Sequence, residues 1–279
     1  MKRAFIILMV SITGCLNLFP QHNKYPFDVK ISGKGTKPII FIPGFACSSD
    51  VWDETIKVFE KDYLCIRITM HGFAGLKPDA NPTLKKWVDE IAKYIVWEKI
   101  KNPIIIGHSL GGIMALWLAS DYPKLVSKIV DIDALPCYAA LMDAGFKSNR
   151  QLDCTGNINV MKSMDDKALY KMQKGNMELM IADTSKIETV VHWNQLSDRT
   201  TMGETFCEFL NTDLRDTIAH AICPSLIMLE PSFKPSEAAI ANQFRKMRGA
   251  KIVYADKGLH FIMYDDKPWY FNQLKAFLR

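Results

Sequence analysis

The strongest constraint on the fold is a short strand that runs into a glycine-flanked serine and then into a helix. Residues 104–106 are three isoleucines, and residues 107–112 read Gly-His-Ser-Leu-Gly-Gly. A helical pattern follows at once from Ile113 to Tyr122. β-Branched residues favour a strand, and the glycines beside Ser109 permit a sharp turn. The segment therefore predicts a serine held between a buried strand and the N-terminus of a helix.

This arrangement gives the serine a chemical context. A G-x-S-x-G sequence between a strand and a helix forms a nucleophile elbow. The free N–H groups and the positive dipole end of the helix would face a negative oxygen formed beside Ser109. The alternative interpretation is a glycine-rich turn with a bystander serine, so partner residues elsewhere in the chain decide between the two.

Apolar strands alternate with helical patterns along most of the chain. The predicted strands lie at residues 38–42, which run into the Pro43-Gly44 turn, and at 63–69, 104–106, 127–133, 225–230 and 251–255. Continuous apolar strands of this kind predict an α/β fold with a doubly wound, mostly parallel sheet covered on both faces. Chemistry in such sheets gathers at the carboxyl ends of the strands, where the sequence places Phe45, Ser109, Asp133 and Glu230.

The alternation stops between residues 135 and 211. This stretch is helical in composition and rich in methionine, which predicts a helical cap over the active end of the sheet. Methionine side chains suit an adaptable apolar cavity, or they form the cap's own core. The chain thus divides into a first core segment (28–134), the cap (135–211) and a second core segment (212–279), within the size of one domain with an insertion.

Three motifs together resemble the α/β-hydrolase fold family. They are Phe41-Ile42-Pro43-Gly44-Phe45, the Gly-His-Ser-Leu-Gly elbow, and Gly258-Leu259-His260-Phe261 after the cap. The resemblance covers residues 28–279. It implies an eight-stranded type of sheet, a Ser-His-acid triad and hydrolysis with no cofactor and no metal.

The residues themselves support these roles. A serine hydroxyl needs a base that removes its proton, and His260 follows the last strand on a short loop that reaches the carboxyl edge of the sheet. The backbone N–H groups of Leu110 and, by resemblance, Phe45 would form the oxyanion hole. The family usually has His-Gly where this chain has Pro43-Gly44, which leaves a main-chain donor possible.

The acid is where the sequence departs from the family. The turn after residues 225–230 has no aspartate at the usual place. Asp133 and Glu230 are the two substitutes, and we favour Asp133, which ends the strand after the elbow helix. Asp131 would share its face but lies deeper in the strand.

The leading function is a serine hydrolase that cleaves an ester or related acyl bond of a small, fairly apolar substrate through an acyl-enzyme. The alternative is a non-catalytic ligand-binding or sensor protein on the same fold, which the missing acid motivates. A surface-anchored interaction module is a third interpretation. The partner expected from the sequence is a small acyl substrate, and no oligomeric state is assigned.

The N-terminus predicts export. Lys2-Arg3 precedes an apolar stretch of about nine residues, too short to span a bilayer. Residues 12–15, Ile-Thr-Gly-Cys, then resemble a bacterial lipobox, in which Cys15 would carry the lipid. Residues 1–15 would be the signal peptide and 16–27 a tether, giving a lipid-anchored protein at the periplasm or cell surface; an ordinary secretory signal or an uncleaved anchor are the alternatives.

The net charge and the cysteine pattern limit which other functions and bridges the sequence allows. The formal net charge of +5 falls to +3 without Lys2 and Arg3, which does not indicate nucleic-acid binding. Seven cysteines leave six beyond Cys15, with no C-x-x-C pair. Bridges Cys137–Cys154 and Cys154–Cys207 are both compatible with the sequence, and Cys65 is expected in the core.

Overall fold

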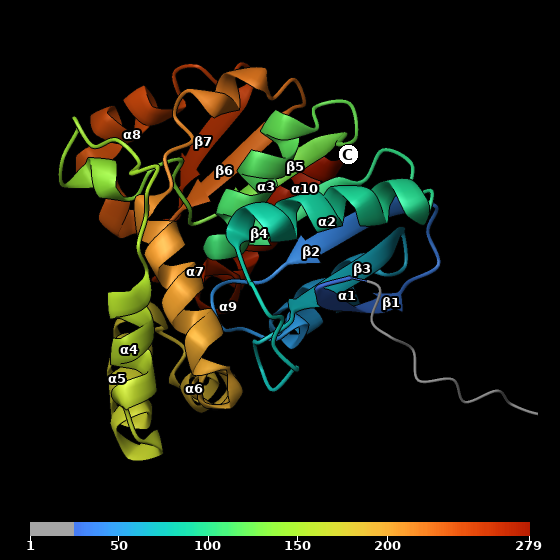
Figure 1. The fold of residues 1–279 in the computed structure, drawn as a ribbon. Coiled ribbons are helices and arrows are strands. Elements are labelled where there is room, and N and C mark those ends of the chain that lie inside the picture. Colours follow the sequence, from blue (N-terminus) through green and yellow to red (C-terminus); the bar gives the residue numbers. More distant parts are fainter. Residues whose placement is uncertain (1–24) are drawn as a thin grey trace, which may run out of the picture.

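A single sheet of seven strands forms the centre of the molecule in the structure, a computed structural model that describes residues 25–279 (Figure 1). From edge to edge the strands are β1 (Phe27–Ser32), β3 (Tyr63–Met70), β2 (Lys37–Ile42), β4 (Ile104–His108), β5 (Lys128–Ile132), β6 (Ser225–Leu229) and β7 (Ala250–Tyr254). Only β1 runs antiparallel to its neighbour. The predicted mostly parallel α/β sheet is confirmed.

The strand count differs from the resemblance. Seven strands are present among residues 25–279, where an eight-stranded type was implied. The two edge strands are β1 and β7, and no described residue pairs beyond either of them.

The central strands are apolar because both of their faces are covered. Every residue of β4 and β6 is buried, and in β2 only Lys37 is exposed. Successive side chains alternate between faces, so Ile40 and Ile42 join one core and Ile39 and Phe41 join the other. This two-sided burial explains the absence of polar alternation in the strand sequences.

Helices cover both faces of the sheet. The helices α2 (Leu84–Trp97), α3 (Leu110–Asp121) and α8 (Glu237–Phe244) contribute to the core on the Ile40 face. The helices α1 (Asp53–Phe59), α9 (Ile262–Asp265) and α10 (Lys267–Leu278) contribute to the other. Helix α2 begins after Thr83, whose side chain accepts a hydrogen bond from the Lys86 N–H as an N-cap.

Four helices follow β5 before the chain returns to the sheet at β6. They are α4 (Thr155–Ser163), α5 (Asp166–Met180), α6 (Ile187–Leu196) and α7 (Arg199–Asn211). Helix α4 packs on α7 and α5 on α6, and the four stand together at one end of the molecule (Figure 1). They occupy the carboxyl-terminal part of the predicted 135–211 insertion, whose first part holds only a short 3-10 turn, Ala139–Leu141.

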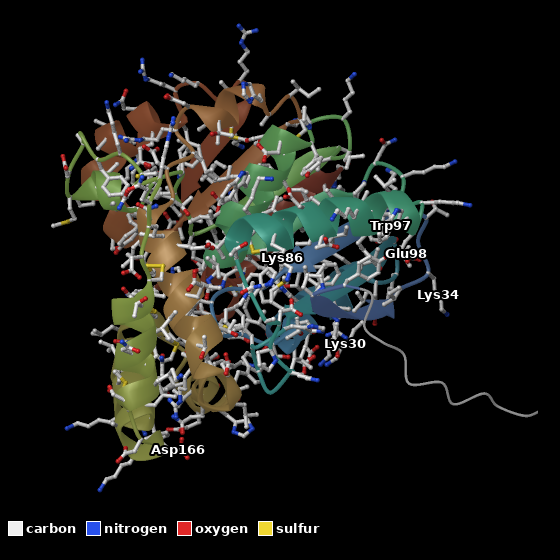
Figure 2. The ribbon with its side chains drawn as sticks, in the orientation of Figure 1. Lys30, Lys34, Lys86, Trp97, Glu98 and Asp166 are labelled. Carbon is white, nitrogen blue, oxygen red and sulfur yellow. A yellow bond between two sulfur atoms is a disulfide. The ribbon has the colours of Figure 1, made fainter. Side chains whose placement is uncertain are left out.

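One disulfide ties this insertion together. Cys154, just before α4, is bonded to Cys207 on α7, with the two Cα atoms 5.7 Å apart; Figure 2 shows a disulfide as a yellow bond. Of the two bridges compatible with the sequence, the structure thus contains Cys154–Cys207. Cys137 is free and buried, and Cys65 lies in the core as expected.

The predicted signal peptide, Cys15 and residues 16–24 of the tether lie outside the described residues. Within residues 25–279, no helix combines the length and the apolar character needed to cross a bilayer.

Candidate active site

The turn between β4 and α3 holds Ser109 in an unusual backbone conformation. Its φ is +54° and its ψ is −119°, at the N-cap of α3. The Ser109 N–H donates to the Ile132 carbonyl oxygen at 2.8 Å, and its own carbonyl accepts from the N–H groups of Gly112 and Ile113. These bonds hold the strained residue in place and leave its side chain at the carboxyl end of β4.

The glycines of the motif are required by close approach. A Cβ on Gly107 would lie 2.0 Å from the Gly111 carbonyl oxygen, and one on Gly111 would lie 2.3 Å from the Ile42 carbonyl oxygen. No side chain fits at either distance. The strand, the turn and the helix can therefore pack this tightly only with glycine at both positions.

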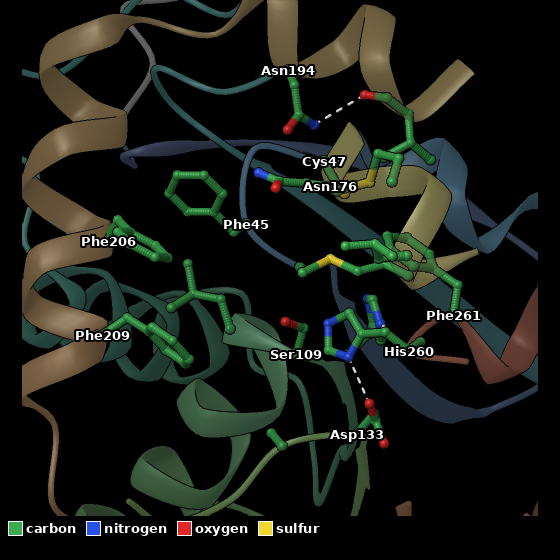
Figure 3. A pocket seen from close by; sticks show the side chains of 18 of the residues that line it. Phe45, Cys47, Ser109, Asp133, Asn176, Asn194, Phe206, Phe209, His260 and Phe261 are labelled. Atoms are coloured by element: carbon green, nitrogen blue, oxygen red, sulfur yellow. Dashed lines mark hydrogen bonds and ion pairs between the residues drawn. The ribbon is translucent and has the colours of Figure 1, made fainter. Parts of the chain in front are cut away.

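His260 and Asp133 form the closest polar contact of the site. The Nδ1 of His260, on the loop after β7, lies 2.6 Å from Oδ2 of Asp133 (Figure 3). Such a distance fits an N–H donated by the ring to a carboxylate. Asp133 has a φ of +58°, and its own N–H donates to the Met228 carbonyl oxygen of β6 at 2.8 Å. The end of β5 is therefore fixed against β6 in the orientation that aims the carboxylate at His260.

Glu230, the alternative acid, supports Asp133 through its backbone N–H. Its N–H donates to Oδ1 of Asp133 at 2.7 Å, while its carboxylate accepts a hydrogen bond from Ser232. Burial raises the pKa of Glu230, and the Asp133 carboxylate raises it further. Of the two candidate carboxylates, that of Asp133 contacts His260, whereas Glu230 contacts Asp133 through its backbone N–H.

Burial perturbs both aspartates at the end of β5. It raises the pKa of Asp133, while the hydrogen bonds from His260 and from the Glu230 N–H act in the opposite direction. Burial and the Asp133 charge hold the pKa of Asp131 well above its usual range. The Asp131 Oδ1 accepts from the Ala134 N–H at 3.1 Å. Asp131 thus supports the turn after β5, and no hydrogen bond joins its side chain to His260 in residues 25–279.

Ser109 and His260 face each other across the bottom of the site. Ser109 lies next to the His260 ring in Figure 3, and the two side chains share no hydrogen bond in the described part of the chain. Catalytic hydrogen bonds are often long in free enzymes and tighten when substrate binds. Proton transfer from Ser109 to Nε2 would require the hydroxyl to turn toward the ring.

His108 holds the loop that carries His260. Its ring is fully buried, and its Nε2 lies 3.0 Å from the His260 carbonyl oxygen. The two rings are 4.7 Å apart between centroids. Burial, followed by the nearby His260, lowers the pKa of His108 well below its usual range, so the ring is neutral and donates from Nε2. The elbow motif by itself does not predict this contact between His108 and the His260 loop.

The predicted oxyanion donors lie beside Ser109. Phe45 and Leu110 both line the cavity that contains Ser109. Neither N–H donates a hydrogen bond to any residue between 25 and 279, so both are free for a ligand. A Cβ on Gly44 would lie 2.9 Å from the His108 ring, which shows how closely the Pro-Gly turn packs on the elbow.

A cavity of about 500 Å³ opens above these residues. Volumes of this size are ordinary for small-molecule sites. The sheet supplies its floor and the inserted helices supply its walls, with Phe206 and Phe209 from α7 (Figure 3). Among the inserted methionines, four line the cavity: Met161, Met172, Met177 and Met180. Met202 is instead buried in the core and Met142 is 90% exposed, so the methionine-rich stretch serves both of the roles considered for it.

Metal-binding groups are not concentrated at this site. Residues 25–279 contain no group of three or more His, Cys, Asp or Glu side chains placed to hold a metal ion.

Comparisons with known proteins agree with this architecture. Residues 37–153 match the family described as "alpha/beta hydrolase fold". A pimeloyl-[acyl-carrier protein] methyl ester esterase of Wigglesworthia glossinidia brevipalpis is 22% identical over 208 residues, which cover 72% of this chain and 76% of the relative.

Two solved structures show the same fold over nearly the whole chain. An esterase from Exiguobacterium antarcticum has a TM-score of 0.75 at 18% identity and covers 90% of this chain and 94% of its own. The enol-lactonase from Burkholderia xenovorans LB400 has a TM-score of 0.72 at 13% identity, covering 91% and 96%. The family match and these likenesses together show the fold of the chain.

Proposed function

We propose that this chain, which has the α/β-hydrolase fold, is a cofactor-free serine hydrolase that cleaves an ester or related acyl bond of a small, fairly apolar substrate. The observation that carries the proposal is the 2.6 Å contact between His260 Nδ1 and Asp133 Oδ2, placed behind the strained Ser109. Relatives named as esterases support the reaction class.

The geometry accounts for an activated serine. Asp133 accepts a hydrogen bond from the Nδ1–H of His260, which leaves the lone pair of Nε2 on the side of Ser109. As Ser109 Oγ attacks the substrate carbonyl carbon, its proton passes to Nε2, and Asp133 stabilises the imidazolium that forms. The carbonyl oxygen becomes an oxyanion, which the N–H groups of Phe45 and Leu110 bind.

Collapse of this intermediate releases the first product. The carbon–oxygen bond to the leaving alcohol breaks, and His260 Nε2 returns its proton to that oxygen. An acyl-Ser109 ester remains. Water then attacks the acyl carbon while His260 removes its proton, and a second collapse releases the acid and restores the Ser109 hydroxyl.

The rival function is ligand binding without catalysis on the same fold. Its motive was the absence of an aspartate after residues 225–230. Asp133, at the end of the neighbouring strand, contacts His260 in its place, so the missing aspartate no longer argues against catalysis. The remaining difference between the two functions is the reactivity of Ser109.

Labelling of Ser109 by a fluorophosphonate probe tests the proposal directly. The purified protein from residue 16 onward should be labelled, and the Ser109→Ala variant should not. A series of p-nitrophenyl esters would then measure the acyl length that the cavity accepts. A folded wild-type protein that resists the probe would favour the ligand-binding function.

We also propose that the protein is exported and lipid-anchored through Cys15, with no other membrane contact. The basis is the sequence of residues 2–15, and the Cys154–Cys207 bridge supports it because disulfides persist in oxidising compartments. Mass spectrometry of the mature protein should find a lipid-modified N-terminal Cys15. An unmodified N-terminus at Met1 or Leu16 would contradict the proposal.

A further inference from the structure

The inward face of α5 contains one residue that does not fit its surroundings. Its buried side chains are Leu169, Gln173 and Met177, spaced four residues apart on one face of the helix. Gln173 is only 4% exposed and lines the cavity. An apolar residue would be expected at the centre of such a stripe.

The Gln173 amide has no hydrogen-bond partner among residues 25–279. No hydrogen bond joins its side chain to any residue in the described part of the chain. Gln243, which is equally buried outside the cavity, has its Oε1 bonded to the Cys137 N–H at 3.1 Å, while its Nε2 has no partner among residues 25–279. The Gln173 amide differs because it is open to the cavity, so a group bound there can satisfy it. The cavity is the side from which that group can come.

Asn194 presents a second unmatched group on the same cavity. It is 1% exposed, and its Nδ2 donates both hydrogens, to the carbonyl oxygens of Ala46 at 3.3 Å and Val190 at 2.9 Å. These bonds fix the amide and leave Oδ1 without a donor in residues 25–279. Figure 3 shows Asn194 across the cavity from Ser109 and His260.

The charges of the cavity add a constraint. No lysine or arginine lines it, whereas Asp133 and Glu230 do. A substrate carboxylate would therefore meet the half-buried Glu230, with the shielded Asp133 behind His260, and no lysine or arginine. An uncharged group with a hydrogen to donate would instead satisfy Asn194 Oδ1 and pair with Gln173.

We infer that the substrate is a neutral ester that carries a hydroxyl or amide N–H away from the bond that is cleaved, and that Gln173 and Asn194 bind this group. The inference rests on the proposed function and narrows its substrate class. A site built to hydrogen-bond a substrate group discriminates against analogues that lack the group.

Matched ester pairs test the inference. Butyl 6-hydroxyhexanoate is compared with butyl heptanoate, and 4-hydroxybutyl hexanoate with pentyl hexanoate, by proton release. At least one hydroxyl ester should exceed its methyl isostere by about tenfold in kcat/KM. The monobutyl ester of adipic acid, which adds a carboxylate, should be the poorest substrate.

Gln173→Met assigns the effect to the amide. In this variant the ratio between hydroxyl ester and isostere should fall to about one, and its melting temperature shows whether it is folded. Gln243→Met removes an equally buried amide outside the cavity and should keep the wild-type ratio. Equal rates for both pairs in the wild type, a retained ratio in Gln173→Met, or efficient cleavage of the adipate ester would overturn the inference.

A binding measurement separates this inference from the proposed function. Calorimetry on Ser109→Ala should find the preferred hydroxyl ester bound about tenfold more tightly than its isostere, with the difference lost when Gln173→Met is added. If the wild type cleaves no ester but this preference is present, the hydrolase function fails and the inferred ligand class stands. Equal binding of the two esters refutes the ligand class in either case.

Discussion

Replacing Asp133 with asparagine should disable His260 while leaving the site's shape intact. The Glu230 N–H donates to Asp133 Oδ1 at 2.7 Å, so an asparagine would keep its oxygen there. Its NH₂ group would then lie where Oδ2 now meets His260 Nδ1 at 2.6 Å. Two donors cannot face each other at that distance, so the imidazole would shift its proton to Nε2 and could no longer accept one from Ser109.

The expected loss follows from this change of tautomer. The same exchange in the Ser-His-Asp template lowers kcat by about 10⁴-fold, which corresponds to ~5.4 kcal/mol of transition-state stabilisation. Asp133 also stabilises the imidazolium of the transition state, and its side chain is fully shielded from solvent, so water cannot replace it. We expect a fall in kcat of about 10³–10⁴-fold with little change in KM.

Two neighbouring carboxyl groups provide matched controls. Glu230→Gln keeps the backbone N–H that orients Asp133, and Asp131→Asn keeps an oxygen that can accept from the Ala134 N–H. Both variants should retain kcat within about tenfold of the wild type, measured with p-nitrophenyl butyrate and alongside the rate of fluorophosphonate labelling. The reasoning is refuted if a folded Asp133→Asn enzyme keeps wild-type turnover, or if Glu230→Gln loses it instead.

Three further predictions concern the structure around this site. Burial lowers the pKa of His108, so only the unfolded state binds a proton at this residue as the pH falls below 6.5. The free energy of unfolding of the wild type should therefore fall relative to that of His108→Gln as the pH decreases. The expected slope is up to ~1.4 kcal/mol per pH unit until the pKa of His108 in the folded state is reached. Urea unfolding at several pH values measures this, and parallel curves would count against it. Gly107→Ala should prevent folding because its Cβ would lie 2.0 Å from a backbone oxygen. As a control, Gly175→Ala in helix α5, whose Cβ would have nothing within 4 Å, should stabilise the protein by up to ~1 kcal/mol in thermal unfolding. A folded Gly107→Ala protein would disprove the packing argument. Removing the bridge with Cys154→Ser and Cys207→Ser, which are 53 residues apart, should lower stability by up to ~4 kcal/mol and raise KM more than it changes kcat. Reductant should reproduce this effect in the wild type alone, and a wild type that is insensitive to reductant would contradict the role of the bridge.

The reactive elements of the site were predictable because their signals are local. The glycines around Ser109 are demanded by contacts within one strand, one turn and one helix, so they leave a compact motif. The buried strands leave continuous apolar runs because both faces of the sheet are covered. His260 follows the last strand on a short loop, which places it at the carboxyl edge of the sheet.

The choice between the two candidate acids depended on the tertiary structure. Asp133 and Glu230 end adjacent parallel strands, and sequence alone leaves both within reach of His260. The positive φ of Asp133 and the N–H of Glu230 orient the Asp133 carboxylate toward the ring. A backbone dihedral and a bond between two strands leave no pattern in the sequence.

The cavity was likewise decided by packing. Composition predicted an insertion rich in methionine and helix, because amphipathic stretches and their residue types are local properties. Which methionines face the cavity, which cysteine pairs with Cys154, and the isolation of Gln173 depend on how α4 to α7 pack on one another and over the sheet. Sequence therefore predicted the candidate serine, the candidate histidine and the scaffold, whereas the carboxylate that meets this histidine and the wall of the cavity arose from contacts between segments far apart in the chain.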